Sequence, residues 1–114
     1  DMEALYDLLH PDCVFISPVV HTPQEGREIT YAYLRAANKA LSEDFQYVRE
    51  VVQDNHAVLE FTVKVDGLFV NGVDIITFEG DQIVEFKVMV RPLKAVNAVW
   101  KQMGEMLEQL KAAS

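Results

Sequence analysis

One carboxyl group in an otherwise apolar stretch is the part of this sequence best suited to do chemistry. Asp74 stands in the segment VDIITF, residues 73–78. If this segment is a β-strand, alternation places Asp74 on the same face as Ile76 and Phe78. An unpaired carboxylate in such surroundings costs several kcal/mol, and its pKa rises as a result. We expect Asp74 either to contact a ligand as a general acid or base, or to accept hydrogen bonds from a buried Tyr, His or backbone group.

Two histidines are the other candidates for acid-base chemistry, because imidazole titrates near neutral pH. His21 leaves a predicted strand close to Ser17 and could reach the mouth of a cavity, or it could have no functional role. His10 precedes Pro11 and is better explained as a cap of the first helix. Cys13 has no nucleophile signature around it, and a small buried Cys is the more common situation. The three His are scattered without the spacing of a metal site, so we predict no metal and no other cofactor.

The residues expected to surround Asp74 indicate what it would act on. They favour a pocket for a small hydrophobic molecule, which Asp74 would orient. In an enzymatic version, Asp74 transfers a proton on a hydrophobic carbonyl compound with help from His21 or Tyr47. The predicted lining consists of the polar residues Ser17 and Tyr47 and the apolar residues Phe15, Phe61, Ile76, Phe78, Phe86 and Val88.

Length and charge limit the classes of function. A chain of 114 residues, half of them hydrophobic, fits one domain with one core. Its formal net charge of −8 opposes binding to nucleic acids and to anionic membrane surfaces. No segment is apolar enough for a membrane span, no signal peptide opens the chain, and a single cysteine cannot form an intrachain disulfide, so we expect a cytoplasmic protein. Because Asp1 already lies in a helical pattern, we also expect that residues upstream are missing.

The elements that would position these residues follow from hydrophobic periodicity. A short helix in the first ten residues should end at Pro11, and two short strand pieces at a sheet edge should span residues 13–20. Thr22 and Glu25 have the spacing of a capping box, which predicts a helical turn over residues 22–25. A longer amphipathic helix is expected over residues 27–41, and another beyond Pro92.

Between these helices the period changes to two, which predicts four strands. They cover residues 45–53, 57–66, 69–79 and 82–91, and the short turns between them make consecutive strands antiparallel neighbours. In the last strand, the apolar row Val84, Phe86, Val88 and Val90 should face the helices. The predicted fold is α+β, with a bent antiparallel sheet that curls around a ligand-sized pocket.

The outward face of this sheet suggests an alternative function. Val73, Ile75, Thr77 and Met89 should point away from the helices, although a solvated sheet face is normally more polar. We therefore predict a homodimer formed through this face. In the alternative interpretation, the chain is a non-catalytic binding or scaffold module that works through the outer sheet face.

Two segments resemble a known family. The stretches CVFISPVVHTPQEGREITYAYL, residues 13–34, and GVDIITFEGDQIVEFKVMVRP, residues 72–92, resemble the SnoaL-like branch of the nuclear transport factor two-like superfamily. The resemblance covers most of the chain. It implies a cone-shaped fold, helices packed into the concave side of a curved sheet, a pocket between them, and often a dimer.

The resemblance leaves the activity open, because one fold can carry many functions. Family members include polyketide cyclases, relatives of ketosteroid isomerases and epoxide hydrolases, and proteins that only bind or scaffold. In the cyclases, the last long strand carries an inward Asp that serves as the base. The matching position in this chain is Val88, so the resemblance does not supply that base here.

Overall fold

The computed structural model describes the backbone of residues 2–113 and the side chains of residues 2–109. This part of the chain forms three helices and six strands. In chain order they are α1 (Met2–Leu8), β1 (Leu9–Ile16), β2 (Gln24–Glu25), α2 (Arg27–Ala40), β3 (Glu43–Gln53), β4 (His56–Val65), β5 (Leu68–Glu79), β6 (Gln82–Arg91) and α3 (Leu93–Ala113). What precedes Asp1 lies outside the described residues. None of the helices in the described part of the chain has the length and hydrophobicity that a membrane span requires.

All six strands belong to one curved sheet with the order β2-β1-β6-β5-β4-β3. The four long strands β3 to β6 are consecutive antiparallel neighbours, which confirms the predicted strands and their connections. The three hairpin turns contain residues with positive φ, namely Asp54, Asp66, Gly67 and Gly80. Asp and Gly tolerate this conformation, which explains why the chain reverses at these points.

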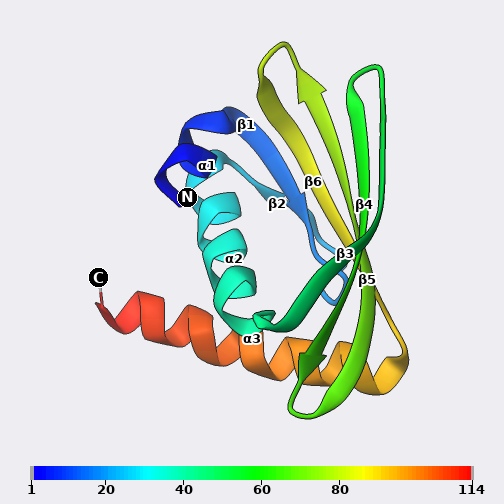
Figure 1. Ribbon diagram of the computed structural model, residues 1–114. Coiled ribbons are helices and arrows are strands. Elements are labelled where there is room, and N and C mark those ends of the chain that lie inside the picture. Colours follow the sequence, from blue (N-terminus) through cyan, green and yellow to red (C-terminus); the bar gives the residue numbers. More distant parts are fainter. Residues whose placement is uncertain (1, 114) are drawn as a thin grey trace.

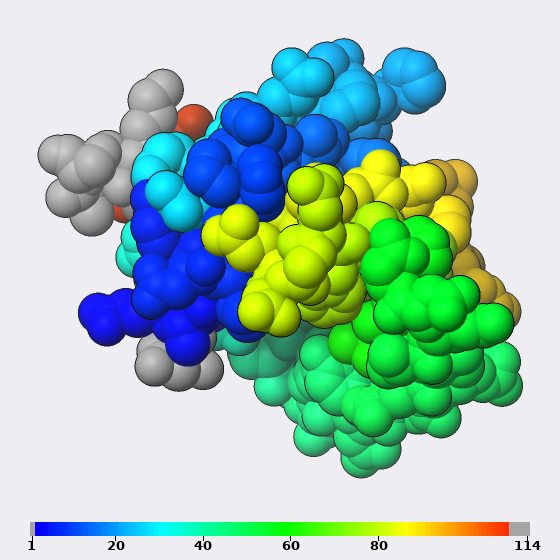
Figure 2. All heavy atoms as spheres, turned by 90° about the horizontal axis from the view of Figure 1, so that it is seen from above, coloured from blue at the N-terminus to red at the C-terminus, as the bar shows by residue number. Residues whose placement is uncertain are grey.

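The helices lie on the concave side of the sheet (Figure 1). Helix α2 runs along the sheet, and α3 lies across the lower ends of α2 and of the sheet in this view. Seen from above, the N-terminal segment lies beside the β5–β6 hairpin (Figure 2), in agreement with the pairing of Leu9 with Ile83. Two apolar clusters fill the concave side, one around Phe15 and Ile76 and the other around Phe61 and Val99.

The first third of the chain differs from the prediction. Strand β1 begins at Leu9, so Pro11 lies within a strand and does not end the first helix. Strand β1 is also not at the edge, because it pairs in parallel with β6 on one side and with β2 on the other. The predicted helical turn over residues 22–25 is wrong: its last two residues form β2, which pairs with Val14 and Phe15. Helix α2 is instead preceded by Gly26, whose φ of 108° favours glycine.

A β-bulge between β5 and β6 changes which residue at the start of β6 faces inward, so the predicted apolar row is wrong at one position. Thr77 pairs with Glu85, but the next residue of β5, Phe78, pairs with Ile83, so Val84 is left over. An extra residue reverses the alternation beyond the bulge. Ile83 therefore enters the core in place of Val84, whereas Phe86 and Val88 face inward as predicted.

Candidate functional site

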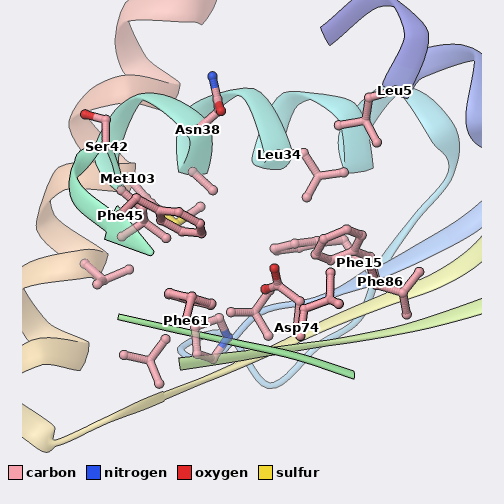
Figure 3. Close-up of a pocket in the computed structure, with 18 of the residues that line it drawn as sticks. Leu5, Phe15, Leu34, Asn38, Ser42, Phe45, Phe61, Asp74, Phe86 and Met103 are labelled. Atoms are coloured by element: carbon pink, nitrogen blue, oxygen red, sulfur yellow. The ribbon is translucent and has the colours of Figure 1, made fainter. Parts of the chain in front are cut away.

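A cavity of about 440 Å³ lies between the concave face of the sheet and the three helices. The sheet forms its floor, and side chains from α1, α2 and α3 cover it, as the close-up shows for Leu5, Leu34 and Met103 (Figure 3). The volume is in the range of sites that bind small organic ligands, about 300 to 1,000 Å³. Most of the lining is apolar, so the few polar groups determine what the cavity can bind.

Alternation along β5 brings Asp74 to the cavity wall. Asp74 pairs with Leu59 of β4 and with Val88 of β6, and all three residues line the cavity. Its carboxyl group points from the sheet toward α2 (Figure 3). Ile76 is two residues further along the same strand and also lines the cavity.

The carboxyl group of Asp74 has no partner among the described side chains that would compensate the loss of hydration. Among the side chains that the structure describes, none hydrogen-bonds to Asp74 or forms an ion pair with it. Burial raises the pKa of Asp74 from 3.8 to about 7, because the charged form loses hydration. The interpretation in which a buried Tyr, His or backbone group satisfies Asp74 finds no such contact here.

Tyr47 is the second titratable group of the cavity. It lies on β3 with half of its surface exposed, so it belongs to the rim. Burial of the remaining half raises the pKa of its phenol, and the negative charge of Asp74 raises it further. Asn38 and Ser42, at the end of α2, are exposed polar residues of the same lining.

Phe61 owes its position to a glycine on the neighbouring strand. Gly72 pairs with Phe61, and a Cβ atom at Gly72 would overlap the ring, with Cε1 only 2.9 Å away. The missing side chain thus lets the ring lie flat against β5. Phe45 stacks on this ring at a centroid distance of 5.2 Å.

The predicted site residues divide into two groups. Those that line the cavity are Phe15, Tyr47, Phe61, Asp74, Ile76, Phe86 and Val88. Three others are not among the lining residues. The hydroxyl of Ser17 accepts hydrogen bonds from the backbone N–H groups of Val19 and Val20, His21 is exposed, and Phe78 packs against the core near the bulge. The expectation that His21 reaches the cavity is therefore not met.

Sequence reasoning missed much of the cavity lining, including the cover that the helices provide. The missed residues are Met2, Leu5, Pro18, Leu34, Ala37, Asn38, Leu41, Ser42, Phe45, Leu59, Val90, Val99 and Met103. The helical stripes predicted that these helices face the sheet, but not which residues lie above Asp74. Among the described residues, no group of His, Cys, Asp or Glu could hold a metal ion.

An open, curved sheet whose helices enclose an apolar cavity is a cone-shaped α+β fold, and this fold defines the class of the protein. The model of the SnoaL-like domain family matches residues 1–86. The chain belongs to the SnoaL-like family, whose structural neighbours share the nuclear transport factor two-like fold. No curated protein matches the chain.

Solved structures support this assignment. A steroid delta-isomerase from Pseudomonas aeruginosa is 37% identical with a TM-score of 0.92, and the match covers 98% of this chain and 83% of that chain. A bacterial protein with a cystatin-like fold from Silicibacter pomeroyi is 34% identical with a TM-score of 0.85, covering 92% and 74%. An NTF2-like protein of unknown function from Mesorhizobium loti, 23% identical with a TM-score of 0.72 and coverages of 81% and 79%, is similar in fold.

Proposed function

We propose that this protein binds a small, mainly apolar carbonyl compound in the cavity, and that Asp74 acts on it as an acid or a base. The observation that carries the proposal is the largely buried carboxyl group of Asp74, which lies among apolar side chains and has no partner among the described side chains. A ligand atom can supply the hydrogen bond that the described side chains do not provide. The 37% identity to a steroid delta-isomerase supports chemistry in which a proton moves on a hydrophobic compound.

The pKa of about 7 suits both directions of proton transfer near neutral pH. In its protonated form, Asp74 donates a hydrogen bond to the carbonyl oxygen. In its ionised form, it removes a proton from the carbon next to the carbonyl, which leaves an enolate and a neutral carboxylic acid. The acid then returns a proton to carbon, either the one it removed or, after exchange with water, one from the solvent. Tyr47 stays protonated, because its pKa is raised, and supplies a hydrogen-bond donor at the rim. His21 has no part in this scheme.

Hydrogen–deuterium exchange tests the proposal directly. 2-Tetralone is a small aromatic ketone, and the loss of its α-proton NMR signals in D₂O measures proton abstraction. We expect the protein to accelerate exchange above the buffer rate, with a rate that rises with pH around 7. Asp74→Asn should lose the acceleration, while Asp81→Asn, at an exposed hairpin position, should keep it. Equal exchange with Asp74→Asn and the unchanged protein would refute the role of Asp74.

A second proposal concerns the outer sheet face, where we infer that two copies of the chain associate. Val51 of β3 and Met89 of β6 are each 49% exposed on this face. Met89 pairs with Val73, and Val58 of β4 pairs with both Val51 and Ile75. A polar group also lies on this face: Arg49 pairs with Glu60 at 3.6 Å, and this carboxylate accepts a hydrogen bond from Asn71. These features are compatible with a dimer interface that has an apolar centre and a polar rim.

The dimer is tested by the molecular mass in solution. Ile75→Glu places a charge in the apolar centre and should convert a dimer into a monomer in analytical ultracentrifugation. Asn97→Glu adds the same charge on the exposed side of α3 and should leave the dimer intact. A monomeric unchanged protein, or a dimeric Ile75→Glu variant, would rule out this interface.

A further inference from the structure

Asp74 lies in the middle of the cavity floor, not at one end. Along β5, the residues that face the cavity side are Gly72, Asp74 and Ile76, each about 7 Å from the next. Gly72 lies under the ring of Phe61, and Ile76 pairs with Phe86. The carboxyl group therefore has an aromatic side chain on either side of it along the strand.

Each side of Asp74 is an apolar compartment with its own aromatic pair. Phe45 and Phe61 stack at 5.2 Å on one side, and Phe15 and Phe86 stack at 6.3 Å on the other. Figure 3 shows the two pairs on opposite sides of the Asp74 carboxyl group. The two apolar clusters of the core follow the same division, since Phe61 belongs to one and Phe15 to the other.

The remaining polar side chains of the described lining do not provide a buried anchor at either end. Asn38, Ser42 and Tyr47 are all exposed. A carbonyl oxygen placed deep in either compartment would therefore lose its hydration without gaining a donor, which costs binding free energy. Among the described lining residues, the protonated carboxyl group of Asp74, at the centre, provides the donor that such an oxygen needs inside the cavity.

We propose that the ligand carries its carbonyl group at its centre, between two apolar arms that occupy the two aromatic compartments. This inference rests on the proposed function, because it assumes that Asp74 meets a carbonyl oxygen. It specifies the substrate class further: an internal ketone flanked by two ring-sized hydrophobic groups binds in preference to a compound with its carbonyl at one end.

Two isomeric ketones separate these classes. 1,3-Diphenylpropan-2-one has its carbonyl between two benzyl groups, whereas 4′-benzylacetophenone has the same atoms with the carbonyl near one end. Equilibrium dialysis at pH 5.5, where Asp74 is protonated, measures both affinities. We expect the central ketone to bind about tenfold more tightly, the factor typical of one satisfied against one unsatisfied buried carbonyl.

Two variants and one hydrocarbon provide the controls. Asp74→Leu removes the donor without leaving a charge and should abolish the preference between the isomers. The same variant should bind 1,3-diphenylpropane, which has no carbonyl, at least as tightly as the unchanged protein does, because its cavity floor is more apolar. Phe86→Leu removes an aromatic wall from one compartment only and should weaken binding of the central ketone several-fold, because one arm loses its packing contacts.

The outcomes distinguish this inference from the proposed function. Equal affinities for the two isomers, or tighter binding of 4′-benzylacetophenone, would overturn the central position of the carbonyl; if those affinities still fell in Asp74→Leu, the proposed role of Asp74 would stand. If neither affinity depended on Asp74, or neither ketone bound, both proposals would fail. A preference for the central ketone that disappears with Asp74→Leu supports both.

Discussion

Replacing Asp74 by Asn should stabilise the protein at alkaline pH and change little in acid. The folded protein holds the Asp74 proton up to a pH of about 7, whereas the unfolded chain releases it near the ordinary value of 3.8. Between these two pH values the folded state binds more protons than the unfolded state, so stability falls as the pH rises. Above pH 7 the loss is complete, and the charged carboxylate remains buried without a partner.

The size of this effect follows from the pKa. A rise from 3.8 to about 7 corresponds to about 4 kcal/mol of unfolding free energy, at about 1.36 kcal/mol per pH unit. Water that enters the cavity screens part of this cost, so we expect about 2 to 4 kcal/mol at pH 9. Asn has nearly the same shape and no charge, and its variant should escape this loss.

Urea unfolding at pH 4, 5.5 and 9 measures the difference between the variant and the unchanged protein. The gain from Asp74→Asn should be near zero at pH 4, intermediate at pH 5.5 and largest at pH 9. Asp81→Asn, at the exposed β5–β6 hairpin, serves as the control for removing a carboxylate. A gain that did not depend on pH would show that Asp74 is not a buried, unpaired acid, and the reasoning about the site would fail with it.

Three further changes have defined outcomes. Gly72→Ala should cost about 1 to 3 kcal/mol in urea unfolding, because the new Cβ meets the ring of Phe61; combining it with Phe61→Leu should recover part of that loss. Asp74→Asn should lower the pKa of Tyr47, measured by NMR of ¹³C-labelled tyrosine, but not to the ordinary value of 10.0, since burial is the larger cause. Gly26→Ala should destabilise the protein by about 1 kcal/mol or more, because φ at this position is 108°.

Strand alternation was sufficient to predict which side of β5 carries Asp74. In a strand over residues 73–78, alternation places Asp74 on the same face as Ile76. The structure pairs Asp74 with Leu59 and Val88 on the cavity side. The same logic failed at Val84, because the bulge that brings Ile83 inward depends on the pairing partner and not on the residues of β6 alone.

The other differences come from contacts between distant segments. Thr22 and Glu25 satisfy the local rule for a helix start, but pairing of residues 24 and 25 with β1 provides backbone hydrogen bonds that the isolated turn lacks. The cover of the cavity depends in the same way on how α2 and α3 pack together. Leu34 and Met103 lie on predicted helices, but their position over Asp74 is set by tertiary packing, which periodicity does not contain.

The proposed ligand site rests on a largely buried acid that destabilises its own fold, and the pKa of this acid tests which kind of ligand binds there. No described side chain compensates Asp74, whereas an apolar residue at this position would pack against Leu59 and Val88 at no electrostatic cost. A ketone accepts a hydrogen bond only from the protonated acid, so it binds more weakly at high pH. Because binding and protonation are coupled, the bound ketone must raise the pKa of Asp74 above about 7. An ammonium ligand binds the carboxylate and must lower the pKa of Asp74.

Titrating the ¹³Cγ signal of Asp74 with saturating 1,3-diphenylpropan-2-one and with dibenzylamine compares the two cases. We expect the ketone to raise the pKa of Asp74 by about one unit if it prefers the protonated form tenfold. A ketone that lowered this pKa would show that the cavity recognises cations and not carbonyl compounds. Tighter binding of the amine at pH 8.5 than of the ketone at pH 5.5 would show the same.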